Sequence, residues 1–408
     1  MKQSQLFTKT IKEIPKDETS FNAQTLIRAG FVDKVSAGVY SFLPLGWRVL
    51  RKITEIVRDE MEKLGGQEIN MSALAPKSLW NTTGRWDSFD GLFKLGAADS
   101  KEYALCPTHE EMISPLMKKF VLSYKDLPFS AFQIQTKFRN EKRAKAGLMR
   151  GREFLMKDLY SFHQNQEDLD IFYEKSQASY YNIYNRLGLG DKTYLTYASG
   201  GSFAKYSHEY QTLSSSGEDL IYICEKCKVA INKEIIDDLD SCPVCDNKEL
   251  REEKAIEVGN IFKLGTRFSE PFSLIYKDDK GKDNLVYMGC YGVGISRLLG
   301  TIVEECHDEK GIIWPETVAP YRVHIISISE NEKAEELYEN LTSEGIEVLL
   351  DDRDVSVGEK FADSDLIGCP YRIVVSRKTL EKGGYELKRR NSEEVELVES
   401  DKIIEIIK

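Results

Sequence analysis

The sequence has few of the features that mark membrane, exported and low-complexity proteins. Only 11 of its 408 residues are proline, and it has neither internal repeats nor Ser/Gly-rich linkers. No apolar run approaches the roughly 18 residues that a membrane-spanning helix needs. The first residues, MKQSQLFTKTIKEIPKDE, lack the apolar segment of an export signal. These absences exclude collagen-like and wholly disordered chains. They predict a cytoplasmic protein with no membrane partner.

The composition is that of a globular protein long enough for two or three domains. The chain is 41% hydrophobic, 30% charged and 10% aromatic. Its 56 Lys and Arg residues against 67 Asp and Glu residues give a net charge of −11. This acidic balance does not exclude a nucleic-acid partner, because phosphates respond to the local field rather than to the total charge.

Four of the eight cysteines form two CxxC pairs. Their spacing is Cys224-x2-Cys227-x14-Cys242-x2-Cys245. Four thiolates in two such pairs make a tetrahedral site closed to solvent, which is typical of structural zinc. The spacing therefore predicts a zinc knuckle at about residues 222–250. Iron in the same site, a redox pair and unmetallated thiols are the alternatives.

A long amphipathic helix is expected near the start of the chain. Residues 46–64 place apolar side chains at helical spacing, and Gly65-Gly66 then ends the helix. A strand-like run at 67–73 follows, and Pro76 closes it. Such a helix either packs in the core or builds a dimer interface, and the pattern favours neither.

Two strand-like segments flank a basic loop. Residues 132–141 alternate between apolar and polar side chains, and a second strand-like run covers 152–162. The connection KRAKAGLMRG is long for a hairpin, whose loops usually have about 2–5 residues. Arg139 and Glu141 emerge on the same face. An arginine beside an acceptor and the ring of Phe154 suits a nucleotide. A solvated, charged hairpin is the alternative.

A strand at about 285–294 runs into Gly292 and Gly294 and then into an apolar-striped helix. Arg297 lies in the first turn of this helix, where a cation opposes the helix dipole by roughly 0.3–1 kcal/mol. Arg297 is therefore expected to face an anion, with a plain solvent-facing arginine as the alternative. The third glycine of a dinucleotide fingerprint is missing, which excludes a Rossmann fold.

After about residue 320 the pattern changes to short alternating strands and helices. Strands are expected at 322–329, 346–352 and 371–376, with helices at 330–345 and 358–368. Together they form an α/β module of about 88 residues, the size of a small domain. Pro315 and Pro320 mark the junction, so domains are expected at 1–320 and 321–408.

In this order, the segments resemble a class II aminoacyl-tRNA synthetase, and closely the bacterial-type prolyl-tRNA synthetases. Residues 46–76, 132–162 and 285–305 resemble motifs 1, 2 and 3 of that class. The strings CPTHEE, FLMKDLYSFH, HEYQ, EVGNIFKLGT and GIIWPETVAP are similar to signatures of the prolyl family. Residues 321–408 resemble the anticodon-binding domain that the prolyl, threonyl, histidyl and glycyl enzymes share.

The resemblance implies an α+β fold, with an antiparallel-sheet catalytic domain, a small zinc-knuckle insertion and a C-terminal α/β anticodon-binding domain. It implies a homodimer built through motif 1. The implied enzyme activates L-proline with ATP and Mg²⁺ to prolyl-adenylate and transfers the prolyl group to tRNA(Pro). A non-catalytic, synthetase-like paralogue that binds RNA or a ligand is the alternative.

The resemblance also implies residue roles. Arg139 would hold the α-phosphate and the proline carboxylate, Glu141 would fix the nucleotide, and Arg297 would hold the γ-phosphate; these three are the expected catalytic residues. The other expected ligands of ATP or its Mg²⁺ are Arg150, Phe154, Gln211 and Glu257. With Arg139, the expected proline ligands are Thr108, Glu110, Met156, Gly259, Phe262 and Cys290. The anticodon contacts are expected among Arg353, Phe361, Lys388, Arg389 and Arg390, with solvated surface as the alternative for each.

The sequence departs from the family pattern at two places. Asn260 stands where bacterial prolyl enzymes commonly have histidine. Many of these enzymes also carry a long editing insertion, whereas the stretch from Ala230 to Asp240 has no room for a domain. A missing methylene discriminates by only ~1–3 kcal/mol in an apolar pocket. We therefore expect misactivation of alanine without hydrolysis of Ala-tRNA(Pro) by the chain itself.

Overall fold

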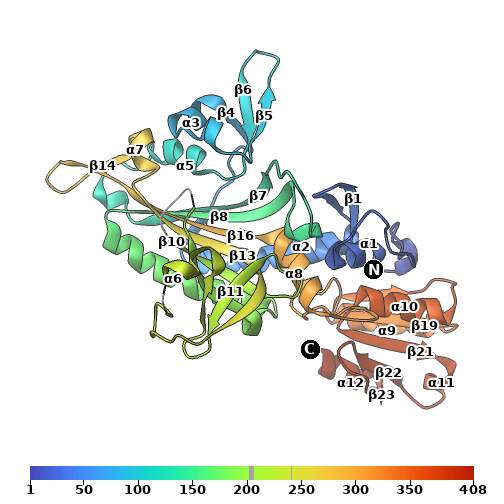
Figure 1. Cartoon of the computed structure of the whole chain (residues 1–408). Helices are drawn as coiled ribbons and strands as arrows, with labels where there is room; N and C mark the ends of the chain where they lie inside the picture. Colours follow the sequence, from blue (N-terminus) through green and yellow to red (C-terminus); the bar gives the residue numbers. More distant parts are fainter. Residues whose placement is uncertain (202–205, 240) are drawn as a thin grey trace. The chain divides into compact units, whose positions relative to one another are not determined.

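A computed structural model describes residues 1–201, 206–239 and 241–408 (Figure 1). Its contacts divide the chain into two compact units. The central unit comprises Ala37–Val39 and Ile53–Thr301, and the terminal unit comprises Met1–Ser36, Tyr40–Lys52 and Ile302–Lys408. The terminal unit thus contains both chain ends. The functional division expected at residue 320 stays a prediction.

The central unit is built on a nine-stranded sheet with the order β10-β9-β12-β11-β13-β16-β8-β7-β3. The neighbouring pairs β12–β9 and β3–β7 are parallel, and the other neighbours are antiparallel. This sheet confirms the expected antiparallel fold. In sheet order the strands are Tyr206–Leu213, Thr193–Ser199, Val229–Asn232, Asp219–Cys224, Leu250–Gly265, Tyr287–Gly294, Glu153–His163, Phe129–Phe138 and Gly66–Glu68.

The expected helices and strands of motifs 1 to 3 are present. Helix α2 covers Pro44–Lys63, strands β7 and β8 form the antiparallel pair, and β16 leads directly into α8 (Ile295–Glu305). The strand expected at 67–73 is shorter, because only β3 pairs there. At Met71 the backbone N–H already bonds to the side chain of Gln133 rather than to a neighbouring strand.

Smaller elements complete both units. A three-stranded sheet has the order β4-β6-β5, and three two-stranded sheets pair β1 with β2, β14 with β15 and β17 with β18. Their strands are Val32–Ser36, Val39–Phe42, Leu74–Pro76, Phe93–Gly96, Glu102–Leu105, Ile275–Lys277, Asp283–Leu285, His307–Asp308 and Gly311–Ile312. The helices α1 and α3 to α7 are Phe21–Arg28, Lys77–Thr82, Arg85–Ser88, Glu110–Met117, Gln166–Arg186 and Ser269–Phe272.

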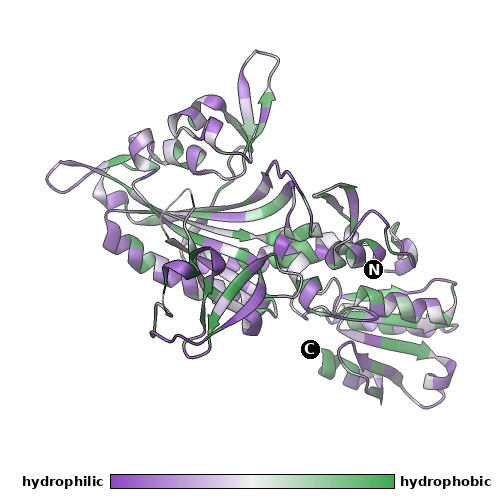
Figure 2. Cartoon of the chain, in the orientation of Figure 1, coloured by the Kyte–Doolittle hydropathy of each residue, from purple (hydrophilic) through white to green (hydrophobic). Residues whose placement is uncertain are grey.

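The terminal unit contains a five-stranded sheet with the order β20-β19-β21-β22-β23. Its strands, in chain order from β19, are Val323–Ile328, Val348–Asp351, Tyr371–Ser376, Tyr385–Arg389 and Val395–Val398. Helices α9 to α12 are Asn331–Ser343, Val357–Ile367, Arg377–Leu380 and Ser400–Ile407. The first three strands and the first two helices match the expected α/β pattern. Figure 2 shows apolar residues gathered along the strands of this sheet.

Helix α6 fixes one face of the central sheet. Asn165 caps its first turn by accepting the N–H of Asp168 at 2.9 Å. Its buried tyrosines, Tyr173, Tyr180 and Tyr184, then lie against the strands that carry the candidate site. Within the described residues, none of the helices is both long and apolar enough to cross a membrane.

Candidate active site

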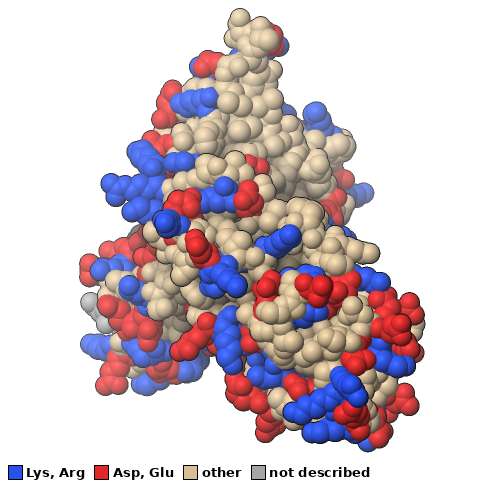
Figure 3. Space-filling model, turned by 90° about the vertical axis from the view of Figure 1, so that its right-hand side faces the viewer, with Lys and Arg blue, Asp and Glu red and all other residues tan. Residues whose placement is uncertain are grey.

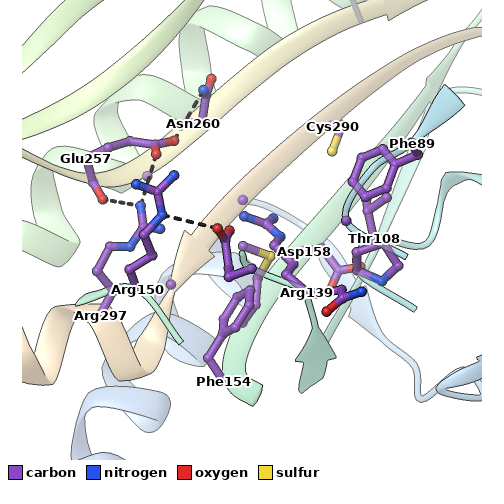
Figure 4. A pocket seen from close by; sticks show the side chains of 18 of the residues that line it. Phe89, Thr108, Arg139, Arg150, Phe154, Asp158, Glu257, Asn260, Cys290 and Arg297 are labelled. Carbon is purple, nitrogen blue, oxygen red and sulfur yellow. Dashed lines mark hydrogen bonds and ion pairs between the residues drawn. The ribbon is translucent and has the colours of Figure 1, made fainter. Parts of the chain in front are cut away.

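A cavity of about 850 Å³ opens in the central unit between the ends of β7, β8, β13 and β16 (Figure 4). All but one of the residues expected to bind ATP or proline line it. These are Thr108, Glu110, Arg139, Glu141, Arg150, Phe154, Met156, Glu257, Gly259, Phe262, Cys290 and Arg297. Asn260 lines the same cavity. Residues more than 180 positions apart in the sequence therefore meet in one place.

Three guanidinium groups lie at one end of the cavity. Arg297 Nη1 donates to the backbone oxygen of Glu257 at 2.6 Å and to its Oε2 at 3.0 Å. Arg150 forms ion pairs with Glu141 at 3.4 Å and with Glu218 at 2.7 Å. The guanidinium of Arg139 lies 5.1 Å from the ring centroid of Phe154. Such an array is suited to the phosphates of a nucleotide.

The aromatic ring beside Arg139 is the one expected to stack on a base. Phe154 is the second residue of β8 and pairs with Lys137 across the β7–β8 ladder. Arg139 lies just after the end of β7. Their contact follows from the strand register, and it places a flat apolar surface next to a cation.

The other end of the cavity has an acceptor group suited to an ammonium ion. The hydroxyl of Thr108 donates to Oε2 of Glu110, which is fully buried. The thiol of Cys290 donates to Oε1 of the same carboxylate at 3.2 Å. Burial, and then the charge of Glu110, raise the pKa of Cys290 well above its usual value. The thiol therefore stays protonated, which argues against a nucleophilic role.

Arg85, which no sequence pattern indicated, lies behind this carboxylate. Its Nη1 lies 3.7 Å from Glu110 and 2.8 Å from Glu111, and all three side chains are buried. Arg85 comes from a short helix, α4, in a segment without strong periodicity. Nothing in its neighbourhood in the sequence marks it as part of the site.

A buried polar network lies beneath the cavity. Lys137 on β7 forms a 2.8 Å ion pair with Asp158 on β8, and its Nζ lies 2.5 Å from Nδ1 of His109. Burial, and then Lys137, lower the pKa of His109 to about 4. The imidazole is therefore neutral: Nδ1 accepts from the lysine, and Nε2–H donates to the oxygen of Ser72 at 3.0 Å. This network fixes the loop that carries Thr108 and Glu110.

Gln211 is the one expected ATP ligand that does not line the cavity. It is fully buried, and its Nε2 donates to Glu209 at 2.9 Å and to Asp219 at 2.8 Å. Glu209 also accepts from the amides of Asn232 at 3.1 Å and Asn260 at 3.2 Å. Burial, and then Glu257, raise the pKa of Glu209 to about 8. Gln211 and Glu257 were predicted from the sequence, but Glu209 and Asp219 were not, because the carboxylates come together only through the neighbouring strands β10, β11 and β13.

The four cysteines of the two CxxC pairs converge in the structure. Their Sγ atoms lie within 4.8 Å of one another. Neighbouring pairs are 3.4 Å (Cys227–Cys242), 3.5 Å (Cys224–Cys245) and 3.6 Å (Cys227–Cys245) apart. A ZnS₄ tetrahedron with Zn–S bonds of about 2.3 Å has edges of about 3.8 Å. The four sulfur atoms thus fit a tetrahedral metal site.

The five residues expected to contact the anticodon differ in their exposure and in the ion pairs that they already form. Arg353 is paired with Asp351 and Asp363, and Arg390 makes two 2.6 Å contacts with Asp308. These two guanidinium groups are engaged inside the terminal unit, and the Arg390 side chain is only 7% exposed. Lys388 pairs with Glu393, and Phe361 lies under the guanidinium of Arg372. The Arg389 side chain is 51% exposed.

Comparisons with known families agree with this architecture. The family "tRNA synthetase class II core domain (G, H, P, S and T)" matches residues 93–306, and the family "Anticodon binding domain" matches residues 322–408. A solved structure, a prolyl-tRNA synthetase of Giardia lamblia in complex with prolyl-adenylate, has a similar fold. It superposes with a TM-score of 0.76 at 22% identity, over 94% of this chain and 75% of that one.

Curated relatives match over the full length. A Proline–tRNA ligase of Caldicellulosiruptor bescii is 34% identical, with 100% of this chain and 98% of the relative covered. One of Dehalococcoides mccartyi is 33% identical, with coverages of 99% and 98%. The alignment with the first runs over 561 positions against the 408 residues here, so at least 153 positions of that alignment have no counterpart in this chain.

Proposed function

The chain belongs to the proline–tRNA ligases, a family of class II aminoacyl-tRNA synthetases, and we propose that its central-unit cavity is the place where L-proline is activated with ATP. One observation carries this assignment. The cavity joins a cluster of guanidinium groups, Arg139, Arg150 and Arg297, to the buried acceptor pair Thr108 and Glu110. The first set suits a triphosphate and the second suits an amino-acid ammonium group.

Activation is a phosphoryl-centred displacement. An oxygen of the proline carboxylate attacks the α-phosphorus of ATP, the bond from that phosphorus to the bridging oxygen of pyrophosphate breaks, and prolyl-adenylate forms. Arg139 would hold the α-phosphate and the attacking carboxylate, and Arg297 the γ-phosphate. Glu141 and Arg150 would fix the nucleotide, with adenine stacked on Phe154. Positioning and charge neutralisation supply the catalysis, and no protein base is required.

The second step transfers the prolyl group to tRNA(Pro). A hydroxyl of the 3′-terminal adenosine attacks the carbonyl carbon of prolyl-adenylate, and AMP leaves with the electron pair of the broken bond. The terminal unit would bind the anticodon. Arg389 is the strongest candidate for that contact because its side chain is 51% exposed and its ion pair with Glu316 is long, at 3.6 Å. Arg353 and Arg390 are held in closer and more buried carboxylate pairs, at 2.7 Å and 2.6 Å.

The amino-acid pocket is proposed to recognise a secondary ammonium group. Proline offers two N–H donors. Because the Thr108 hydroxyl already donates to Glu110, its lone pairs are left to accept one donor, and the Glu110 carboxylate accepts the other. The walls of the pyrrolidine site would be Met156, Gly259, Phe262 and Cys290.

Magnesium bound with ATP would be held at the carboxylate cluster. Glu257 faces the cavity, and the buried Oε1 of Gln211 has no hydrogen-bond partner among the described residues. A carboxylate and an amide oxygen are hard oxygen ligands of the kind that Mg²⁺ prefers. The ion supplies neutralisation of the phosphate charge.

Three further assignments accompany this function. The four-cysteine site is proposed to bind structural zinc.

A homodimer is proposed through α2 and its surroundings, where the Trp47 side chain is 49% exposed. The chain is also proposed to lack editing of its own: the alignment positions without a counterpart exceed the length of a small domain. The cytoplasmic location expected from the sequence stays a prediction.

The test is proline-dependent ATP–pyrophosphate exchange, run with each of the twenty amino acids and without tRNA. Exchange with proline, and weaker exchange with alanine, is expected. Glu110→Gln removes the charge that faces the ammonium group, and we expect it to raise the KM for proline about 10- to 100-fold. The KM for ATP should change much less.

Glu270→Gln, an exposed carboxylate of the same unit, is the matched control and should leave both constants unchanged. Exchange with another amino acid would overturn the pocket assignment. Absence of all exchange from folded protein would favour the non-catalytic paralogue.

A further inference from the structure

The four-cysteine cluster lies at the near ends of three adjacent strands. Strand β11 ends at Cys224, and β12 begins two residues after Cys227. The second pair, Cys242 and Cys245, leads into β13, which begins at Leu250. In the sheet these strands are neighbours in the order β12-β11-β13. One ion bound by the four sulfur atoms would therefore join the ends of three strands that are also paired by the backbone ladders of the sheet.

The far parts of the same strands carry the carboxylate cluster. Asp219 begins β11, Asn232 ends β12, and β13 carries Glu257 and Asn260. These side chains meet around Glu209, which accepts from Asn232 and Asn260, while Gln211 bridges it to Asp219. The cluster adjoins the cavity through Glu257, which Arg297 contacts.

The two ends are too far apart to interact directly. Asp219 and Cys224 are separated by five residues of extended chain, about 17 Å at ~3.3 Å per residue. Any influence of the metal on the carboxylates has to pass through strand register. A slip of one residue turns every side chain of a strand to the opposite face, so register decides whether Asp219 and Asn232 reach Gln211 and Glu209.

Side-chain packing adds little to the backbone pairing at the near ends, where Ile223 pairs with Ala230 and Cys224 pairs with Leu250. The apolar cluster shared by these strands is small, with Ile221, Ile223, Ala230 and Ala255 as its buried members. The ion pairs there, Arg251 with Glu225 and Glu253, are exposed and contribute little. A buried hydrogen bond from Asn247 Nδ2 to Cys224 Sγ, at 3.6 Å, orients one of the sulfur atoms.

We propose that zinc on Cys224, Cys227, Cys242 and Cys245 sets the register of β11, β12 and β13 and so positions the carboxylate cluster for ATP and its Mg²⁺. The metal site thus acts on nucleotide binding indirectly, by holding the strands that carry the carboxylate cluster. Thr108, Glu110 and Cys290, which come from other elements, do not depend on it. The inference rests on the proposed function, because it assumes that the cavity binds ATP.

The test removes the metal and measures the two substrates separately. We expect inductively coupled plasma mass spectrometry to find one zinc per chain in the wild type and none in the double variant Cys242→Ser/Cys245→Ser. The KM for ATP in proline-dependent exchange should rise about 10-fold or more, since small misplacements of charged groups have effects of that size. The KM for proline should change less than about threefold. Cys306→Ser, outside the cluster, is the matched control.

A second variant separates positioning from folding. Asn232→Ala leaves the four cysteines intact, so it should retain zinc and still raise the KM for ATP. Chelation of the wild type, followed by zinc addition, should raise and then restore the same constant. Wild-type exchange with proline tests the proposed function alone. The inference is overturned if the wild type carries no zinc, if the metal-free protein keeps its KM for ATP, or if Asn232→Ala leaves that constant unchanged.

Discussion

Lys157, on β8, is a buried cation with no carboxylate bonded to it among the described residues. Its Nζ donates to the hydroxyl of Tyr180 at 2.8 Å and to the backbone oxygen of Tyr291 at 3.0 Å. Burial lowers the pKa of Lys157 to about 7, and the charge of Asp158 offsets only part of this effect. Between about pH 7 and pH 10 the unfolded chain therefore binds a proton that the folded chain does not. This residue makes the protein more stable as the pH rises through that window and less stable as it falls toward 7.

Lys157→Met should remove this dependence. We expect the free energy of unfolding of the wild type to rise by a few kcal/mol more than that of the variant between pH 7 and pH 10, since each pK unit corresponds to about 1.4 kcal/mol. Urea unfolding at several pH values measures the difference. Lys175→Met, at an exposed position on α6, should show the same pH dependence of the free energy of unfolding as the wild type. Parallel curves for wild type and Lys157→Met would contradict the assignment.

Sequence patterns predicted which residues form the site, but they did not predict which side chains pack around those residues. The motif strings placed Arg139, Glu110 and Arg297, and the cavity contains all three. Alternation in β7 also indicated which side chains share a face, but it could not indicate what covers that face. Lys137 is fully buried because Asp158 and His109, from other segments, supply its partners. Such pairings depend on sheet register and have no local signature.

At the scale of elements, the close approach of α6 to β13 is the feature that shapes the pocket wall. A Cβ atom on Gly259 would lie 2.4 Å from the hydroxyl of Tyr184 and 3.1 Å from the ring of Tyr180. Both tyrosines are fully buried and held between the helix and the sheet, so neither can move freely. The absence of a side chain at 259 is what lets the helix lie this close to the strand.

Gly259→Ala should therefore push α6 away from the sheet. We expect a loss of about 1–3 kcal/mol in the free energy of unfolding, the usual cost of overpacking, together with a higher KM for proline. Thermal or urea unfolding measures the first effect. Gly96→Ala is the matched control, because a Cβ there meets no atom within 4 Å and should leave stability unchanged. Equal stability of the two variants would show that the helix has room to adjust.

Elements with a clear period were predictable, and short ones were not. Helix α2 and the pair β7–β8 have long amphipathic or alternating patterns, which tertiary contacts reinforce. Strand β3 has three residues, and its end is set by the side chain of Gln133, 62 positions beyond Met71. The four cysteines are the opposite case, since their spacing predicted a common site and their Sγ atoms do converge to within 4.8 Å of one another.

At the scale of the whole molecule, the net charge of the chain does not favour attraction of RNA. The chain carries a net −11, and on the face seen in Figure 3 basic and acidic side chains are interspersed. A long-range basic field therefore does not explain the proposed binding of tRNA, which would depend on local groups; Arg389 is the one proposed above.

The shorter length of this chain relative to its relative from Caldicellulosiruptor bescii bears on how accurately proline is distinguished from alanine. The pocket walls proposed here exclude larger amino acids by size but cannot strongly exclude alanine, because discrimination against a missing methylene is worth ~1–3 kcal/mol, or about 10- to 200-fold. A relative with at least 153 more alignment positions has room for a second, hydrolytic site. In this chain, the stretch from Ala230 to Asp240, where the sequence leaves no room for such a domain, contains the end of β12 and a short helical segment, Lys233–Asp238; Asp240 lies outside the described residues.

The purified protein should therefore release Ala-tRNA(Pro) and leave it intact. Preformed Ala-tRNA(Pro), incubated with the protein, is expected to decay at the same rate as in buffer alone, and alanine should be charged to tRNA(Pro) at a measurable rate beside proline. Pro-tRNA(Pro) in the same assay controls for nonspecific hydrolysis. Decay of Ala-tRNA(Pro) well above the buffer rate, with Pro-tRNA(Pro) unaffected, would locate an editing site in the chain, and the knuckle would then be more than a structural closure of the gap.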